Sequence, residues 1–125
     1  AGGSGVMAEV RYRGGNNVAM KLPPHHFDGA VKFYRDTLGL KISDHGESKL
    51  VEFGPIRLWL DRCPQFSQTE LWLEVVASDS DGAAKHLGGE KVVRCDAIEK
   101  LPEGSRGFWI PSPADVVHVI SESGI

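Results

Sequence analysis

Two segments each carry a tryptophan between charged residues at every second position, a spacing that gathers side chains for binding a small molecule. The two triplets are Arg57, Trp59 and Asp61, and Glu70, Trp72 and Glu74. Side chains of a strand alternate between its two faces, so each triplet would share one face. Indole rings stack on planar groups and attract cations, and carboxylates add charge complementarity. We therefore predict that all six residues line a site for a planar, aromatic or cationic ligand.

His118 belongs to a third segment of this kind, in which Val116, His118 and Ile120 alternate. We place it in the same ligand-binding set. Glu70 and His118 are the candidates for moving a proton or for binding a metal ion, because a carboxylate and an imidazole do both. The residues alone do not show whether either is catalytic, so catalytic residues stay unknown and enzymatic activity stays open.

The first half of the chain predicts a strand, a helix and three more strands. Residues 17–22 alternate in hydrophobicity and end at Pro23-Pro24, which predicts a strand and a turn. Apolar residues then recur at three- and four-residue spacing from Phe27 to Leu38, and Gly39 follows, which predicts an amphipathic helix. His25 and His26 would lie in the loop before it. Strands are expected at 41–44, 50–53 and 56–61.

The second half repeats this order. Residues 70–75 alternate, a helix is expected at 79–87 with Asp79 as its N-cap, and strands are expected at 91–95, 106–110 and 116–121. DGAVK at 28–32 matches DGAAK at 81–85, and the same register sets Asn17 on Glu70. A second alignment, made through the turns before the last strands, sets Trp59 on His118. Self-similarity at this long period indicates two copies of one structural module.

Composition narrows the class of protein. The net charge is -3 and the basic residues are scattered, so we expect no nucleic-acid partner. No apolar run approaches the roughly 20 residues that cross a bilayer, so we expect no membrane partner and a cytoplasmic location. No GxGxxG, P-loop, nucleophile elbow or HExxH motif occurs. Residues 1–15 are expected to be a flexible N-terminal segment, and 16–125 a single domain with modules at 16–63 and 68–122.

The stretch AVKFYRDTLGL at 30–40, within two β-α-β-β-β modules, resembles the first helix of the vicinal-oxygen-chelate superfamily of glyoxalases, bleomycin-resistance proteins and extradiol dioxygenases. The resemblance implies an α+β fold in which two tandem βαβββ modules form curled mixed sheets around a concave cavity, with helices outside. It implies pairing of modules within one chain or across a homodimer, and we expect a homodimer.

In metal-dependent members of this superfamily, the first and last strand of each module contribute one metal ligand each. The matching positions here are Asn17, Trp59, Glu70 and His118, of which only Glu70 and His118 are credible ligands. We therefore expect no cofactor and no metal. A shifted register that adds Asp61 to Glu70 and His118 would restore a site for one divalent ion.

The resemblance and the residues together leave two functions open. The first is a metal-free binding protein, similar to bleomycin-resistance proteins and to that extent an antibiotic-resistance protein, which sequesters a planar or cationic ligand. The alternative is a metal-dependent lyase, dioxygenase or thiol transferase that uses Glu70 and His118. A metal-free acid–base pair made by the same two residues is a further possibility.

Overall fold

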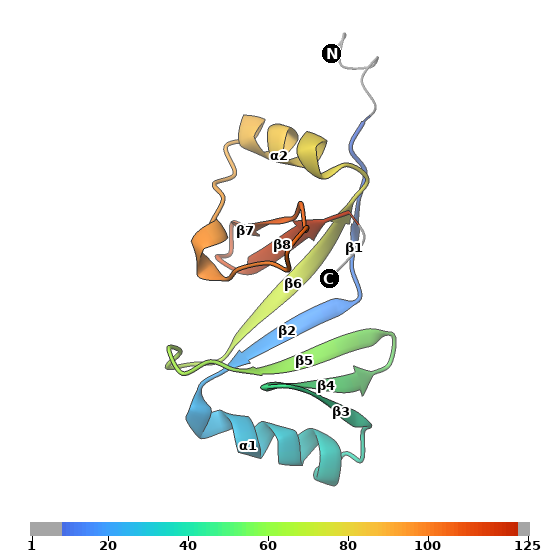
Figure 1. The fold of residues 1–125 in the computed structure, drawn as a ribbon, viewed down its shortest axis with the longest axis vertical. Helices are drawn as coiled ribbons and strands as arrows, with labels where there is room; N and C mark the ends of the chain where they lie inside the picture. Colours follow the sequence, from blue (N-terminus) through green and yellow to red (C-terminus); the bar gives the residue numbers. More distant parts are fainter. Residues whose placement is uncertain (1–8, 123–125) are drawn as a thin grey trace. The chain divides into compact units, whose positions relative to one another are not determined.

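The computed structural model describes residues 9–122, and these form two compact units. Unit 1 consists of the described parts of residues 1–15 and 74–125, and unit 2 consists of residues 16–73. Each unit has its own helix and its own strands (Figure 1). The described residues hold eight strands and two α-helices, which confirms the predicted α+β class.

The sheet of unit 2 has four strands of its own and shares a fifth. They are β2 (Asn17–Leu22), β3 (Ile42–His45), β4 (Ser48–Phe53), β5 (Ile56–Arg62) and the first half of β6 (Glu70–Ala77). Their order across the sheet is β3-β4-β5-β2-β6. β2 runs parallel to β5, and the other neighbouring pairs are antiparallel. Each of these strands was predicted close to its observed position.

Helix α1 (Pro24–Lys32) covers one face of this sheet and continues as the π-helical stretch η2 (Phe33–Thr37). The core between helix and sheet consists of Leu22, Phe27, Val31, Val51, Leu58 and Leu60. Val18 and Met20 pack against this core, so the prediction that they face the helix with Leu22 is confirmed. Gly39 has a φ of +71°, the left-handed conformation that ends a helix and favours glycine.

The start of α1 differs from the prediction. The helix begins at Pro24, before the expected start at Phe27. Proline is well suited to a first helical position, because its missing N–H would have no partner there and its fixed φ is already helical. His25 and His26 therefore lie in the first helical turn and not in a loop. Both are exposed, and their ring centroids are 4.2 Å apart.

Unit 1 is built around helix α2 (Ser80–Gly89). Its other described elements are β1 (Tyr12–Gly14), the second half of β6, the short 3-10 helix η3 (Asp96–Ile98), β7 (Phe108–Pro111) and β8 (Val117–Ser121). β8 lies between β6 and β7, and β1 pairs with β6. Ala77, Ala83, Phe108 and Ile120 form the buried core, so α2 covers the face of β7 and β8 that carries Phe108 and Ile120.

The N-terminal segment is more ordered than predicted, although residues 1–8 lie outside the described part of the chain. Tyr12–Gly14 form β1, antiparallel to the second half of β6. The backbone amide of Arg11 donates to Ser78 Oγ at 2.9 Å, and Tyr12 Oη lies 2.7 Å from His86 Nδ1. Pairing of this kind uses backbone groups that every residue carries, so the glycine-rich composition of residues 1–15 gave no sign of it.

The predicted strand at 91–95 is wrong. Lys91 has a φ of +65°, which lies outside the range of β-strands, and Val93 is 74% exposed. The amides of Lys91 and Val92 donate back to the end of α2, to the carbonyls of Gly88 and Leu87, and the Cys95 amide donates to the Trp109 carbonyl of β7 at 2.9 Å. The run KVVRC is apolar at its centre but does not alternate, so its hydrophobicity alone suggested a strand.

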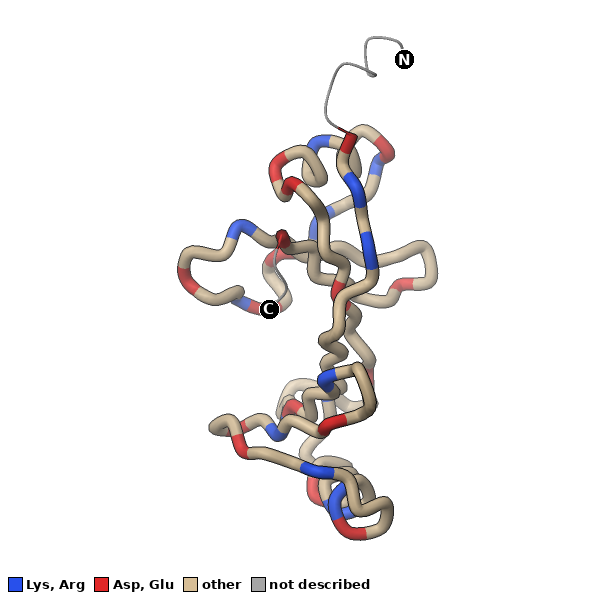
Figure 2. Tube along the Cα trace, turned by 90° about the vertical axis from the view of Figure 1, so that its right-hand side faces the viewer, with Lys and Arg blue, Asp and Glu red and all other residues tan. Residues whose placement is uncertain are grey.

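No helix within residues 9–122 combines the length and the apolar character needed to cross a membrane. Lys and Arg are interspersed with Asp and Glu along the described chain (Figure 2).

Candidate functional site

The face of the unit 2 sheet opposite α1, here called the polar face, carries the predicted ligand-binding residues of this unit. Paired positions on neighbouring strands project to the same side of a sheet, and the apolar positions between them project toward α1. The strand registers confirm the predicted alternation. The polar face comprises Asn17, Ala19 and Lys21 from β2, Arg57, Trp59 and Asp61 from β5, and Glu70 and Trp72 from β6.

A buried ion pair lies at the centre of the polar face. Lys21 is 3% exposed, and its Nζ lies 2.7 Å from Asp61 Oδ2. Ser48 Oγ donates to the other oxygen of the same carboxylate at 2.6 Å. Asp61 therefore already has a cation on one oxygen and a hydroxyl on the other, which reduces its capacity to attract a charged ligand.

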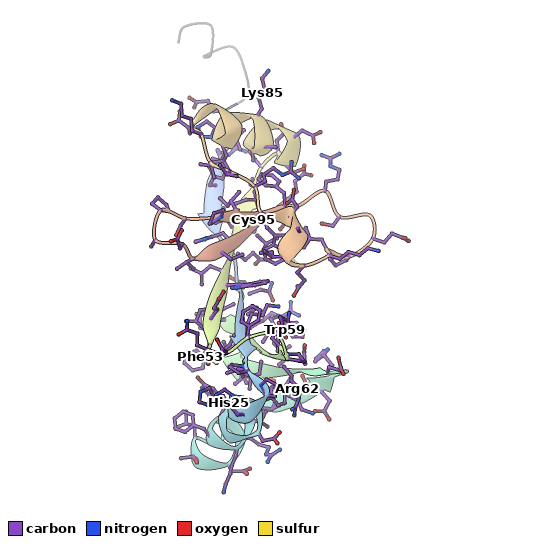
Figure 3. The ribbon with its side chains drawn as sticks, turned by 90° about the vertical axis from the view of Figure 1, so that its left-hand side faces the viewer. His25, Phe53, Trp59, Arg62, Lys85 and Cys95 are labelled. Atoms are coloured by element: carbon purple, nitrogen blue, oxygen red, sulfur yellow. The ribbon has the colours of Figure 1, made fainter. Side chains whose placement is uncertain are left out.

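Trp59 is held in place while its ring stays partly accessible. Its Nε1 donates to Asn17 Oδ1 at 2.9 Å, across the parallel strands β2 and β5. The His45 ring meets it edge to face with centroids 5.0 Å apart, and Arg57 Cζ lies 5.7 Å from the indole centroid. Figure 3 labels Trp59 on the sheet of unit 2 and His25 on α1. A fixed, partly exposed indole is the arrangement that a stacking surface requires.

Trp72 plays a different part because it is only 4% exposed. The ammonium of Lys21 lies 4.4 Å from its ring centroid, and the ring of Phe66 lies 6.1 Å away. Trp72 Nε1 donates to Glu70 Oε1 at 3.0 Å. The indole faces are thus covered by neighbours in the same unit, so Trp72 supports the floor of the polar face more than it offers a surface to a ligand.

His118 does not project where the alternation of its segment predicted. His118 stands opposite Ile110, and Ile120 stands opposite Phe108. These two pairs are two residues apart along the strands, so all four side chains project from the same face of β7 and β8. Ile120 and Phe108 lie in the core with Ala83 of α2, so His118 is on the helix side. Its Nδ1 lies 2.8 Å from the Val116 carbonyl oxygen. The alignment of Trp59 with His118 was out of register by one residue.

The cause of this error lies in the turns. The link between β4 and β5 is a tight turn at Gly54-Pro55, whereas β7 and β8 are joined by a longer turn with Asp115 at a φ of +60°. Aligning the strands through these unequal turns shifts one of them by a residue, and a one-residue shift turns every side chain to the other face. The apolar run 116–120 offers no alternation that would have corrected it.

Glu74 lies in unit 1 and is 5% exposed. Its carboxylate lies against Gly15, where any side chain would collide with it, and the Gly15 amide donates to the Glu74 carbonyl oxygen at 2.8 Å. Glu74 therefore packs against the segment after β1. Its predicted ligand-binding role is not supported by these contacts.

Sequence reasoning missed the side chains that β3 and β4 add to the polar face, among them Leu50, which stands opposite Trp59. His45 and Ser48 were assigned to a turn, but they end β3 and begin β4, and Ser48 pairs with Asp61. The polar alternation of Ser43 with His45, on the side opposite Ile42, was the signal for this placement.

The opposite face of unit 1 is filled by its own chain. Trp109 is 6% exposed, and its Nε1 donates to the Glu99 carbonyl oxygen at 2.9 Å. Its amide donates to Asp96 Oδ1 at 2.9 Å. The segment around η3 thus covers the side of β7 that faces away from α2, and the polar face of unit 2 remains the better candidate site.

The donor atoms do not fit the divalent metal ion that the resemblance implies. Asn17 Oδ1 accepts the indole N–H of Trp59, and an indole has no lone pair for a metal. On the side of β8 away from α2 stand Val117 and Val119, which carry no ligand atom. Of the four positions, Glu70 alone then offers a metal ligand. Residues 9–122 contain no cluster of three His, Cys, Asp or Glu placed to hold a metal.

Comparison with known proteins bears on the fold. No known protein-family profile matches the chain, and no curated protein sequence matches it. The Mn(II)-bound glyoxalase from Novosphingobium aromaticivorans matches with a TM-score of 0.66 and 17% identity, over 91% of this chain and 40% of that chain. A glyoxalase/bleomycin resistance protein/dioxygenase superfamily member from Vibrio splendidus matches with a TM-score of 0.59 and 12% identity, over 90% of this chain and 100% of that chain.

The third comparison is 2,2',3-trihydroxybiphenyl 1,2-dioxygenase from Sphingomonas wittichii, with a TM-score of 0.56 and 23% identity, over 86% of this chain and 40% of that chain. The chain thus spans 40% of the length of the glyoxalase and of this dioxygenase. At these identities the likeness concerns the fold. The resemblance inferred from the sequence is confirmed at that level: the chain has the vicinal-oxygen-chelate fold of glyoxalases, bleomycin-resistance proteins and extradiol dioxygenases.

Proposed function

We propose that this protein binds a planar small molecule without a metal, and that Trp59 is the surface on which the ligand stacks. The observation that carries the proposal is the state of Trp59: its N–H is satisfied by Asn17, the His45 ring packs against it in a T-shaped contact, and the residue stays only half-buried. Ala19 supports this reading, because it stands beside Trp59 on β2 and carries only a methyl group on this face.

Binding is the whole function in this proposal, as in the sequestration of a toxic compound. Proton transfer on the polar face would have to use Glu70, Asp61 or His45. Asp61 is engaged by Lys21 and Ser48, and Glu70 accepts from Trp72. A stacked ligand needs none of these groups to react, whereas it does need a fixed aromatic surface.

The test is isothermal titration calorimetry of the full chain with a neutral planar probe, naphthalene-2-carboxamide. Trp59→Leu removes the stacking surface, and we expect affinity to fall at least about fivefold, since stacking on an aromatic side chain contributes about 1–3 kcal/mol. Phe33→Leu is the matched control, because Phe33 is a 47% exposed aromatic residue of the same unit on η2. Circular dichroism checks that both variants fold.

Two results would overturn the proposal. One is the absence of any binding of planar probes by the folded wild-type chain. The other is equal affinity of wild-type and Trp59→Leu protein, which would place the stacking surface elsewhere.

A further inference from the structure

The charges around Trp59 point to the chemical class of its ligand, an inference that rests on the proposed stacking function. The sequence triplets contain three carboxylates and one guanidinium, which on counting alone favours a cation. The structure changes this balance, because the carboxylates are engaged or remote, whereas the guanidinium of Arg57 lies over the Trp59 ring.

Two of the carboxylates have a polar partner within their own unit, and the third is buried. Asp61 is paired with Lys21, and Glu74 is buried against Gly15 in unit 1. Glu70 accepts from Trp72 and pairs in register with Lys21, on the far side of β2 from Trp59. β6 and β5 are two strand spacings apart, a distance of about 10 Å. The carboxylates of the triplets therefore contribute little negative charge at the accessible ring.

Arg57 is the charged group that contacts that ring. Its Cζ lies 5.7 Å from the indole centroid, and its side chain is exposed. Within residues 9–122 its guanidinium makes no ion pair and donates no hydrogen bond. Glu52 is its cross-strand neighbour on β4, but the two do not form a salt bridge. The five N–H donors of Arg57 are thus available beside a stacking surface.

We infer that the ligand is a planar aromatic acid, whose ring stacks on Trp59 while its anionic group is bound by Arg57. A guanidinium presents parallel N–H donors that match a carboxylate in a two-point contact. Arg57 is two residues from Trp59 along β5 and on the same face, so one small molecule reaches both. The nearby Glu52 opposes the anion and moderates its affinity.

The experiment compares three probes of nearly the same shape by calorimetry at pH 7 and low salt: naphthalene-2-carboxylate, naphthalene-2-carboxamide and naphthalen-2-ylmethylammonium. The expected order of affinity is anion above neutral above cation, with the anion about tenfold tighter than the neutral amide, as one charge-assisted contact provides. Added salt should weaken binding of the anion and leave the amide unchanged.

Variants separate this inference from the stacking function. Arg57→Gln should remove the preference for the carboxylate over the carboxamide, and Arg57→Lys should keep part of this preference. Glu52→Gln should raise affinity for the carboxylate. Arg13→Gln is the matched control, since it removes one exposed positive charge from β1.

Each outcome decides between the two ideas. Equal binding of all three probes, tighter binding of the ammonium, or a carboxylate preference that survives in Arg57→Gln would overturn the acid inference and leave stacking on Trp59 standing. Absence of Trp59-dependent binding of every probe would overturn both.

Discussion

At the scale of single residues, the least expected feature is a lysine buried on a strand. Lys21 lies near the end of β2, where its charge suggests a solvated side chain, yet it is 3% exposed and contacts Asp61 and the ring of Trp72. A buried ammonium requires a counter-charge, and its partner here is 40 residues away in the chain. The pair joins β2 and β5, the first and last strands of one module, on the same face as Trp59.

The first prediction concerns this pair. Lys21→Met should lower the free energy of unfolding by about 3 kcal/mol, because it leaves a largely buried carboxylate without its cation. Asp61→Asn in the Lys21→Met background removes the uncompensated charge. The free energy of unfolding lost in the double variant should therefore be smaller than the sum of the losses in the two single variants, by more than about 1 kcal/mol. Equilibrium urea unfolding measures all four proteins of this cycle. Additive effects would contradict a coupled pair.

At the scale of elements, the end of the chain stabilises the beginning of α2. Asp79 occupies the predicted N-cap position but makes no side-chain cap hydrogen bond. Glu122, just after β8, accepts from the amide and the hydroxyl of Ser80 at 2.8 Å each, and Arg106 donates to the same oxygen at 2.7 Å. These hydrogen bonds from Ser80, followed by that from Arg106, lower the pKa of Glu122 from its ordinary 4.5 to about 2.

The second prediction follows from this lowered pKa. A carboxyl whose pKa is lower in the folded state stabilises the fold fully above its unfolded pKa, and this contribution is lost as the pH falls from about 4.5 through about 2. Glu122→Gln should therefore lower the melting temperature at pH 7, and its difference from wild type should shrink below pH 4.5. Thermal melts by circular dichroism across pH 2–7 test this. Glu103→Gln, an exposed loop carboxyl, is the control; a gap that stays constant with pH would contradict the assignment.

The elements also show what one sequence can reveal. β2 and β5 were predicted correctly because their residues alternate, and a half-buried strand must alternate. Both faces of β8 are buried, as the three consecutive buried residues Val119, Ile120 and Ser121 show. Its sequence pattern therefore carried no information about which face His118 lies on. β1 was missed because it is held by backbone pairing and by Ser78 and His86, contacts that composition does not encode.

At the scale of the whole molecule, the repeated order of elements was enough to predict the fold, while the site depends on contacts between strands that no local pattern specifies. The superposable DGAVK and DGAAK segments do occupy α1 and α2. The pairing of Asn17 with Trp59 spans 42 residues, and a sequence alone gives no distance over such a separation. The same fold supports several chemistries, so the donor atoms present decide between a metal site and a stacking site.

The last prediction concerns the intact protein. Native mass spectrometry after incubation with excess Mn(II), Ni(II) or Zn(II) should show no stoichiometric tightly bound ion, since the ligand positions offer one amide, one indole and one carboxylate. We expect the same spectra to show a homodimer, the assembly implied by the resemblance. One ion per chain that is lost in Glu70→Gln, but kept in the control Glu103→Gln, would contradict the metal-free proposal. It would mean that Glu70 releases Trp72 and recruits ligands that the polar face does not now present.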